Sequence, residues 1–204
     1  NSMLAIYRQQ GKLPIWHLQG NETDCLVGYR AVPVIADACL KGIGGIDPEQ
    51  AFRAMKASSL RDDYGLKYVR EQGWIPADKE IESVSKAMEY AIDDWCIAQM
   101  ARKLHREEDY EVYSVRARAW RRYFDTTTRF VRGVMSDGSW RAPFNPATFE
   151  RRAHDFTEGV SWQYTWMVPQ DVEGLIRLMG GDEAFVTKLD SLFTRKESLG
   201  KDAP

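Results

Sequence analysis

The sequence predicts an all-α fold of helical hairpins with one small β-hairpin, and two observations carry this prediction. Apolar residues recur at intervals of three and four along most of the 204 residues. The periodic segments are about 12 to 24 residues long and are joined by short connections containing Gly, Pro or Asp, which is typical of antiparallel helical hairpins. No repeat of fixed length is present, so the hairpins form either an (α/α) toroid or an irregular bundle.

The expected elements follow from local patterns along the chain. Residues 1–11 look like the back half of an amphipathic helix without its own cap, as in a chain that begins inside a longer protein. Pro33 should kink or interrupt the helix that contains it. RFVRGVMSDGSW (residues 129–140) has β-branched residues around an Asp-Gly turn, which predicts the hairpin. Further helices are expected at residues 25–43, 47–59, 82–105, 107–124, 169–180 and 182–193.

The composition is that of an ordinary globular domain. Apolar residues make up 44% and charged residues 28%, and the net charge of -2 is mixed in sign along the chain. This gives no electrostatic footprint for a nucleic acid or an anionic membrane. No apolar run is long enough to span a bilayer, and no signal peptide is visible. The cysteines show no metal-ligand spacing and are expected to be buried apolar residues: Cys25, Cys39 and Cys96.

The segment DFTEGVSWQYTW (residues 155–166) is the main candidate for catalysis. If a helix runs through it, Glu158, Trp162 and Trp166 share one face. Burial against two indoles would then keep a proton on the Glu158 carboxyl, as a general acid requires. The other interpretation is structural: Asp155 and Glu158 have the spacing of a capping box, and the tryptophans form the buried face of the helix. The residues alone leave both interpretations open.

Two loops combine polar and aromatic side chains. HLQGNETDCLVGYR (residues 17–30), with Trp16 before it, offers a polar pocket wall that includes Asn21 and Glu22, or simply the N-cap of the next helix. SWRAPFNP (residues 139–146) is a stiff aromatic loop containing Trp140, which either contacts a substrate or covers the core.

Acidic residues also gather on the helix expected at residues 82–105. Glu89 and Asp93 are four residues apart, a like-charge pair that is unfavourable unless it is exposed or paired with cations. A solvated or salt-bridged face is therefore favoured, with Arg116 among the possible partners. The motifs HExxH, GxSxG, GxGxxG and the P-loop are absent from the sequence, so zinc hydrolysis, serine acyl transfer and nucleotide chemistry have no support.

Six stretches occur together in an order typical of one enzyme family. They are LPIWHLQGNETDCLVGYRAVPVIADACLKGI, AFRAMKAS, ESVSKAMEYAIDDWCIAQMA, SDGSWRAPFNP, DFTEGVSWQYTWMVPQDVEGLIRLMGG and FVTKLDSLF. In these stretches, which cover nearly the whole chain, the sequence resembles glycoside hydrolase family 92, the calcium-dependent exo-acting α-mannosidases. The resemblance implies that the helical hairpins are part of an (α/α)6 barrel.

The resemblance also implies a mechanism and the residue that acts as the general acid. The family inverts the anomeric carbon with a general-acid Glu and a carboxylate base, which must lie roughly 6.5 to 9.5 Å apart to admit a water. The acid lies in the family's Thr-Glu-Gly segment, so Glu158 takes that role here. The expected substrate contacts are Trp16, Asn21, Glu22, Trp140, Trp162 and Gln163.

The family's base lies in a DxDxGxMS-type motif and its calcium ligands come partly from a GNEP motif, and neither occurs in this sequence. We therefore expect residues 1–204 to be a fragment of a single catalytic domain, truncated at both ends. The fragment should be inactive alone and should hold no catalytic calcium, and its uncovered helix faces leave self-association open. The whole protein should bind calcium and hydrolyse terminal α-linked mannose from glycans, and by family resemblance it is a bacterial protein of the periplasm or the extracellular space.

Two positions depart from the family pattern. Arg30 stands where the family usually has the His of a Gly-Tyr-His sequence, and Val160 stands where the family usually has Asn. Together with the missing base motif, these departures keep open a helical scaffold that binds glycans or proteins without catalysis. An (α/α)6 glycosidase acting on another sugar also stays open, because the fold alone does not fix the substrate. Cleavage of α-1,2, α-1,3, α-1,4 or α-1,6 linkages is equally compatible with the sequence.

Overall fold

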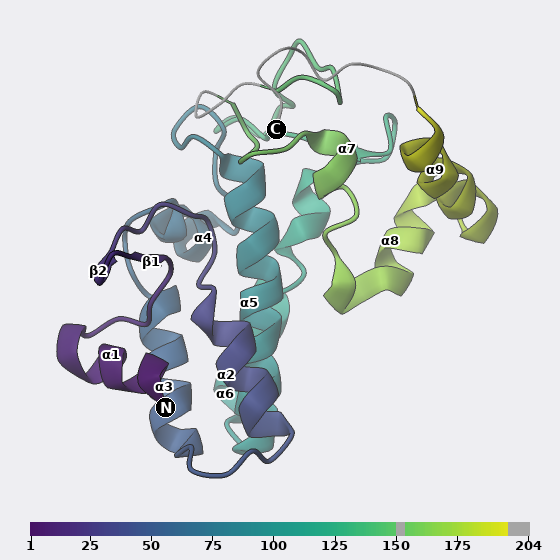
Figure 1. Ribbon diagram of the computed structural model, residues 1–204. Coiled ribbons are helices and arrows are strands. Elements are labelled where there is room, and N and C mark those ends of the chain that lie inside the picture. The colour runs from purple at the N-terminus through teal and green to yellow at the C-terminus, as the bar shows by residue number, and fades with distance from the viewer. Residues whose placement is uncertain (150–153, 196–204) are drawn as a thin grey trace. The chain divides into compact units, whose positions relative to one another are not determined.

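The structure is a computed structural model that describes residues 1–149 and 154–195. These residues are mainly helical, with α-helices α1 to α9 and two short antiparallel strand pairs (Figure 1). The chain divides into two compact units, the first formed by residues 1–73 and 89–118 and the second by residues 74–88 and 119–204. The predicted fold class, helical hairpins with few strands, is confirmed, although neither of the two strand pairs is the hairpin that the sequence predicted.

The first unit is built from helices around its own apolar core. Its helix α3 packs against both α1 and α2, as Figure 1 shows for α1 and α3. In chain order its elements are α1 (Ser2–Gln10), β1 (His17–Leu18), β2 (Asn21–Glu22), α2 (Ala31–Leu40), α3 (Pro48–Ser59), α4 (Leu66–Gln72), most of α5 (Ser83–Lys103) and α6 (Glu107–Arg116). Large side chains that are buried in this core include Leu13, Met55, Ile97, Met100 and Tyr113.

Local signals set the start of α3 as the sequence predicts. The Asp47 carboxylate accepts the backbone N–H groups of Glu49 at 3.0 Å and of Gln50 at 3.3 Å. Pro48 occupies the first helical position, where a missing N–H costs nothing. The helix expected at residues 47–59 is confirmed, and so is the one expected at residues 82–105, which forms α5.

The helix expected at residues 25–43 is shorter than predicted, because α2 begins only at Ala31. The backbone before it is bent, with φ of 47° at Asp24 and 86° at Gly28. The Tyr29 N–H donates to Asp93 Oδ2 at 2.7 Å and not to a carbonyl one helical turn earlier. Pro33 therefore lies in the first turn of α2, where it breaks no helical hydrogen bond. The N-cap predicted in the polar loop before this helix is not formed.

The second unit contains the remaining short elements. Helices α8 and α9 pack against each other as a hairpin (Figure 1). After the start of α5, its elements in chain order are the 3₁₀ helix η1 (Ala119–Tyr123), β3 (Phe124–Asp125), β4 (Phe130–Val131), α7 (Ser161–Tyr164), the 3₁₀ helix η2 (Pro169–Asp171), α8 (Val172–Met179) and α9 (Asp182–Thr194). Large side chains that are buried here include Ile75, Met88, Trp120, Tyr123, Leu175 and Met179.

Several predicted boundaries in this part of the chain need correction. The helix expected at residues 107–124 ends at Arg116 and is followed by η1 and β3. The hairpin expected at residues 129–140 is reduced to a single bridge between Val134 and Trp140 around the Asp-Gly turn, while the regular strand pair β3–β4 lies earlier. Cys25 is exposed, whereas the other two cysteines are buried as predicted. Among the described residues, none of the helices has the length and apolar character needed to cross a membrane.

Candidate active site

Glu158 lies in a turn and not in a helix. Helix α7 begins only at Ser161, so Glu158 does not share a helix face with Trp162 and Trp166. The capping box predicted for Asp155 and Glu158 is not formed either. Glu158 has a φ of 46°, in the left-handed region that residues other than Gly adopt uncommonly, and its side chain is exposed. The burial against indoles that the sequence predicted is therefore not present in the described residues.

Hydrogen bonds to the start of α5 hold the chain that leads into this turn. The backbone oxygen of Asp155 accepts the N–H groups of Val84 and Ser85, each at 3.1 Å. The Thr157 N–H donates to Ser85 Oγ at 2.7 Å, and the Tyr164 hydroxyl donates to the Thr157 oxygen at 2.8 Å. The first N–H groups of a helix have no partner within it. The turn supplies partners for those of α5, and α5 in return fixes the turn.

Gly159 follows Glu158 at a position with no room for a side chain. A Cβ there would lie 2.9 Å from Gln163 Oε1 and 3.1 Å from Tyr164 Cε2. Gln163 uses that oxygen to accept the Val160 N–H at 2.8 Å. A strained backbone conformation costs on the order of 1–3 kcal/mol and persists only where the surrounding structure enforces it. These contacts enforce it, so the Glu158 carboxyl projects from a rigid turn.

The tryptophans after the turn take part in packing. The Trp162 ring is half-buried and meets Phe130 edge-on, with ring centroids 4.6 Å apart. Trp166 meets Phe185 of α9 in the same way at 5.4 Å. Lys188 Nζ lies 3.2 Å from the Phe130 centroid, and burial lowers the pKa of Lys188 to about 8. Both half-buried indoles therefore pack against aromatic rings of the second unit without forming the buried face of one helix, and Gln163 beside Trp162 is exposed.

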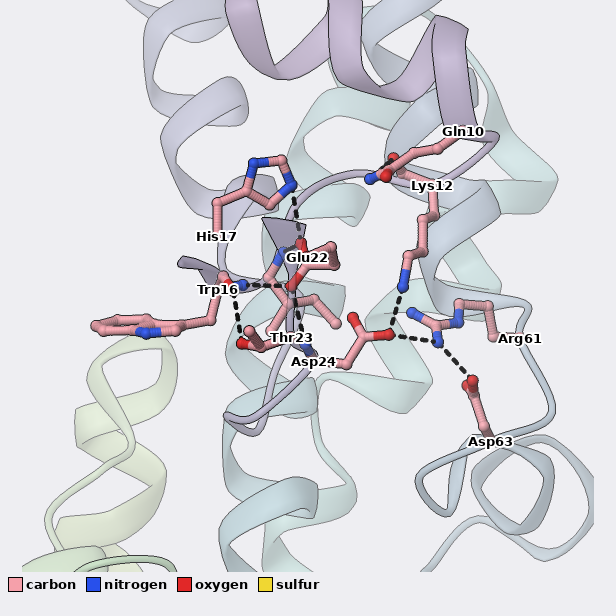
Figure 2. Close-up of polar contacts among 10 residues, drawn as sticks. Gln10, Lys12, Trp16, His17, Glu22, Thr23, Asp24, Arg61 and Asp63 are labelled. Atoms are coloured by element: carbon pink, nitrogen blue, oxygen red, sulfur yellow. Dashed lines mark hydrogen bonds and ion pairs between the residues drawn. The ribbon is translucent and has the colours of Figure 1, made fainter. Parts of the chain in front are cut away.

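The hairpin β1–β2 pairs Leu18 with Asn21 and His17 with Glu22 in the first unit, and Figure 2 shows Trp16 beside Glu22. Its turn residues, Gln19 and Gly20, have φ values of 52° and 79°, which is the two-residue turn that suits the twist of a hairpin. The Trp16 side chain is 47% exposed, and Asn21 is exposed as well. An indole face and an amide are thus available at one edge of the hairpin.

Glu22 organises the backbone of this hairpin. Its carboxylate accepts the N–H groups of Ile15 at 2.8 Å, Trp16 at 2.9 Å and Asp24 at 2.9 Å, and lies 3.2 Å from His17 Nε2. Burial on its own would raise the pKa of Glu22, but these three donors and His17 hold it below its usual value. Glu22 is therefore an ionised carboxylate whose oxygens are largely occupied by the protein.

Ion pairs tie the hairpin to the rest of the first unit (Figure 2). Asp24 pairs with Lys12 and lies 3.6 Å from Arg61 Nη2, and Arg61 also pairs with Asp63. These contacts join the end of the hairpin to the segment between α3 and α4. The hairpin is thus fixed at its base while Trp16 stays exposed at its edge.

Acidic residues of α5 are buried, which sequence reasoning missed. Glu89, Asp93 and Asp94 are all inaccessible to solvent or nearly so. Arg30 Nη2 lies 2.9 Å from Glu89 Oε1, and Arg116 Nε lies 2.8 Å from Asp94 Oδ2. Burial raises the pKa of Glu89 to about 7 and that of Asp94 to about 6, although the arginines oppose it. The expectation of a solvated face is wrong, and the salt-bridged alternative is confirmed.

Gly28 is the signal that could have revealed this burial. A Cβ at Gly28 would lie 3.2 Å from Glu89 Oε2 and 3.3 Å from Asp93 Oδ2, and the φ of Gly28 is 86°. A glycine between apolar residues often marks a close approach of two backbones. Here it marks the approach of the loop before α2 to the acidic side of α5.

Trp140 lies in the second unit. Its side chain is 36% exposed, and the Arg132 guanidinium carbon lies 5.7 Å from the ring centroid. The candidate residues therefore fall into two groups, each described by itself. The first unit holds Trp16, Asn21 and Glu22, and the second holds Trp140, Glu158, Trp162 and Gln163.

A family model and solved structures both match this chain to the same enzyme family. The model of the glycosyl hydrolase family 92 catalytic domain matches residues 1–203. The fold is similar to a family 92 α-mannosidase of Bacteroides thetaiotaomicron solved with mannoimidazole, with 46% identity, a TM-score of 0.91, and coverage of 97% of this chain and 27% of that one. It is also similar to an inverting family 92 mannosidase of the same species, with 32% identity, a TM-score of 0.88, and coverage of 97% and 27%.

A curated relative from Arthroderma benhamiae, described as an uncharacterized secreted glycosidase, is 28% identical over 227 residues, which are 93% of this chain and 29% of the relative. The chain thus spans between a quarter and a third of the length of each of these proteins.

Proposed function

The chain belongs to glycosyl hydrolase family 92, and we propose that it forms part of the catalytic domain of an inverting α-mannosidase that removes terminal α-linked mannose from glycans. The observation that carries this proposal is the similarity over 97% of the chain to an α-mannosidase that was solved with mannoimidazole. The inverting outcome is supported by the similarity to a mannosidase described as inverting.

Glu158 is the proposed general acid. Its carboxyl donates a proton to the glycosidic oxygen as the bond to the anomeric carbon breaks, while a carboxylate outside this chain takes a proton from the attacking water. The strained and tightly bonded turn supports this role, because a catalytic acid must be held in one place relative to the leaving oxygen. Exposure of the side chain leaves it accessible to a substrate.

The remaining site residues differ in which side-chain groups are available to contact a substrate. Trp16 and Trp140 expose indole faces on which the apolar face of a sugar ring can stack. Asn21 offers an exposed amide. Glu22 is mainly occupied by backbone donors, so its contribution is to hold Trp16 and Asn21 in place. Trp162 and Gln163 lie directly after the Glu158 turn, and we place them at the wall of the same subsite.

Calcium is implied for the whole protein by the family resemblance. The described residues contain no group of three or more His, Cys, Asp or Glu side chains that could hold a metal ion. No step of the proposed reaction is therefore assigned to calcium through the described residues. The proposed ligands lie elsewhere in the full-length protein. The description of the fungal relative as secreted supports a periplasmic or extracellular location.

Substitution of Glu158 in the full-length protein tests this function. Glu158→Gln keeps the size of the side chain and removes the acid, so hydrolysis of α-linked mannobiose should fall on the order of 10²–10⁴-fold. Glu173→Gln is the matched control, because Glu173 is an exposed carboxyl of the same unit with a single i,i+4 partner. Mannose release is measured by chromatography, and folding is checked by circular dichroism. Undiminished turnover in Glu158→Gln would remove Glu158 from the role of the acid.

A further inference from the structure

Asp155 is a buried carboxylate three residues before the proposed acid. Its side chain is only 2% exposed. Oδ1 accepts the Ser83 hydroxyl at 3.1 Å, and Oδ2 lies 3.0 Å from Arg141 Nε. Gly133 leaves the space that the carboxylate fills, since a Cβ there would come within 2.7 Å of the Asp155 carboxyl carbon. The charge of Asp155 is therefore enclosed on several sides and has Arg141 as its ionic partner.

Arg141 connects separate segments of the second unit. Its backbone N–H donates to the Gly133 oxygen at 2.9 Å, and its own oxygen accepts Arg132 Nη2 at 2.6 Å. Its guanidinium donates to the Ala77 oxygen as well as pairing with Asp155. Arg141 also follows Trp140 directly, so one side chain links the aromatic loop, the segment that precedes α5 and the chain that leads into the Glu158 turn.

The contacts of Asp155 and Arg141 matter more for the position of the chain than for the stability of the fold. Asp155 is buried while the Arg141 side chain is 29% exposed, and an ion pair of this kind adds little net stability compared with well-packed apolar residues, because desolvation of the carboxylate offsets the attraction. What Arg141 supplies is a tether between segments, since its guanidinium reaches both Asp155 Oδ2 and the Ala77 oxygen. Only Phe156 and Thr157 separate Asp155 from the proposed acid, and the structure fixes both residues. Phe156 is buried, and both the backbone N–H and the backbone oxygen of Thr157 are hydrogen-bonded.

We propose that Asp155 and Arg141 are positioning residues that fix the carboxyl of Glu158 relative to the leaving oxygen and to Trp140. This inference rests on the proposed function, because it takes Glu158 as the general acid. The pair touches neither the substrate nor the reacting atoms. Its effect on the rate comes through the orientation of the Glu158 turn, and a displacement of that turn by about 1 Å lowers the rate on the order of 10²-fold.

The dependence on the leaving group separates this role from a merely structural one. A sugar hydroxyl is a poor leaving group and needs the proton of the acid, whereas dinitrophenolate leaves readily without it. Misplacement of the acid therefore slows hydrolysis of α-linked mannobiose and spares dinitrophenyl α-mannoside. General damage to the fold or to mannose binding slows both substrates alike.

The experiment measures kcat/KM of the full-length protein on both substrates. The Asp155→Asn variant keeps an acceptor for Ser83 and removes the charge, and Arg141→Lys keeps the charge and removes the planar guanidinium that reaches Asp155 and the Ala77 oxygen together. Both should lose on the order of 10²-fold on mannobiose and stay within about threefold of wild type on the dinitrophenyl substrate, with the smaller loss in Arg141→Lys. Arg121→Lys is the matched control, because Arg121 pairs with Asp171 at 2.7 Å in the same unit and should leave both values unchanged.

A double variant, Asp155→Asn with Arg141→Gln, keeps the test decisive if a single substitution prevents folding, because it buries no unpaired charge. It should show the same selective loss on mannobiose. Equal losses on both substrates, or no loss on either, overturn the positioning role while the response of Glu158→Gln still stands. If Glu158→Gln itself loses equally on both substrates, then Glu158 is not the acid and the inference falls with it.

Discussion

Glu89 shows how a single residue can make the stability of the chain depend on pH. Its side chain is 8% exposed and lies near Asp93, which is also buried. Burial raises the pKa of Glu89 from 4.5 to about 7, although the charge of Arg30 opposes this. At a pH between these two pKa values, Glu89 is therefore protonated in the folded chain and ionised in the unfolded chain.

The sign of the effect follows from proton linkage. Between pH 4.5 and about 7 the folded state binds more protons at Glu89 than the unfolded state does, so the free energy of unfolding falls as pH rises through this window. A single group contributes at most about 1.4 kcal/mol per pH unit. The Glu89→Gln variant lacks this titrating group, so its free energy of unfolding should fall less between pH 5 and pH 7 than that of wild type. Urea denaturation at a series of pH values measures the free energy of unfolding of both proteins.

Glu173→Gln serves as the control for this series, because Glu173 is exposed and should leave the slope as it is in wild type. A slope that is equally steep in Glu89→Gln and in wild type would show that Glu89 does not titrate in this window.

Among the elements, the helices that sequence reasoning predicted well are those with local start signals. Helix α3 follows an Asp-Pro pair, and α5 has a long run of helical periodicity. Helix α2 was predicted with the wrong start, and the helix considered for residues 155–166 is reduced to α7, because distant contacts decide where both helices begin. The Tyr29 N–H bonds to Asp93, which is 64 residues away in the chain, and the Thr157 N–H bonds to Ser85, which is 72 residues away. No pattern of neighbouring residues reveals such partners.

The same reason explains which parts of the candidate site were predictable. The hairpin residues Trp16, Asn21 and Glu22 are close in sequence, and a tight Gln-Gly turn keeps them close in space. The surroundings of Glu158 were predicted incorrectly, because helical periodicity was extended through a turn that tertiary contacts hold open. The pairing of Asp155 with Arg141 was not predicted, since it depends on the path of the loop between them.

Helix α3 offers a test of a locally encoded element. Asp47→Ala removes the acceptor for two N–H groups of its first turn and should lower the free energy of unfolding by about 1 kcal/mol. Asp47→Asn keeps an acceptor and should cost only a small part of that. Urea denaturation measures both variants, and hydrogen exchange should report faster exchange at Glu49 and Gln50 in Asp47→Ala. Equal stability of the alanine variant and wild type would show that the cap contributes nothing to α3.

At the scale of the whole molecule, the chain supplies one part of the machinery that the proposed reaction needs. It spans 27% of the two family 92 mannosidases and carries the proposed acid. Inversion also needs a second carboxylate, roughly 6.5 to 9.5 Å from the first, to activate the water. The DxDxGxMS-type motif, which contains the base in the family, does not occur in the 204 residues. The acid and the base are therefore proposed to come from different stretches of a longer protein.

Residues 1–204 alone should therefore release no mannose from α-linked mannobiose, with or without added calcium. An acid without a base can protonate the leaving oxygen but has no activated water to complete the displacement. The full-length protein should hydrolyse the same substrate, lose activity when calcium is removed by a chelator, and regain it when calcium is restored. Mannose release is measured for both proteins under identical conditions.

The Glu158→Gln form of the short chain is the control against a contaminating hydrolase in these preparations. Mannose release by the short chain that depends on Glu158 would mean that the base lies within residues 1–204. The separation of acid and base between this chain and the rest of the protein would then be wrong.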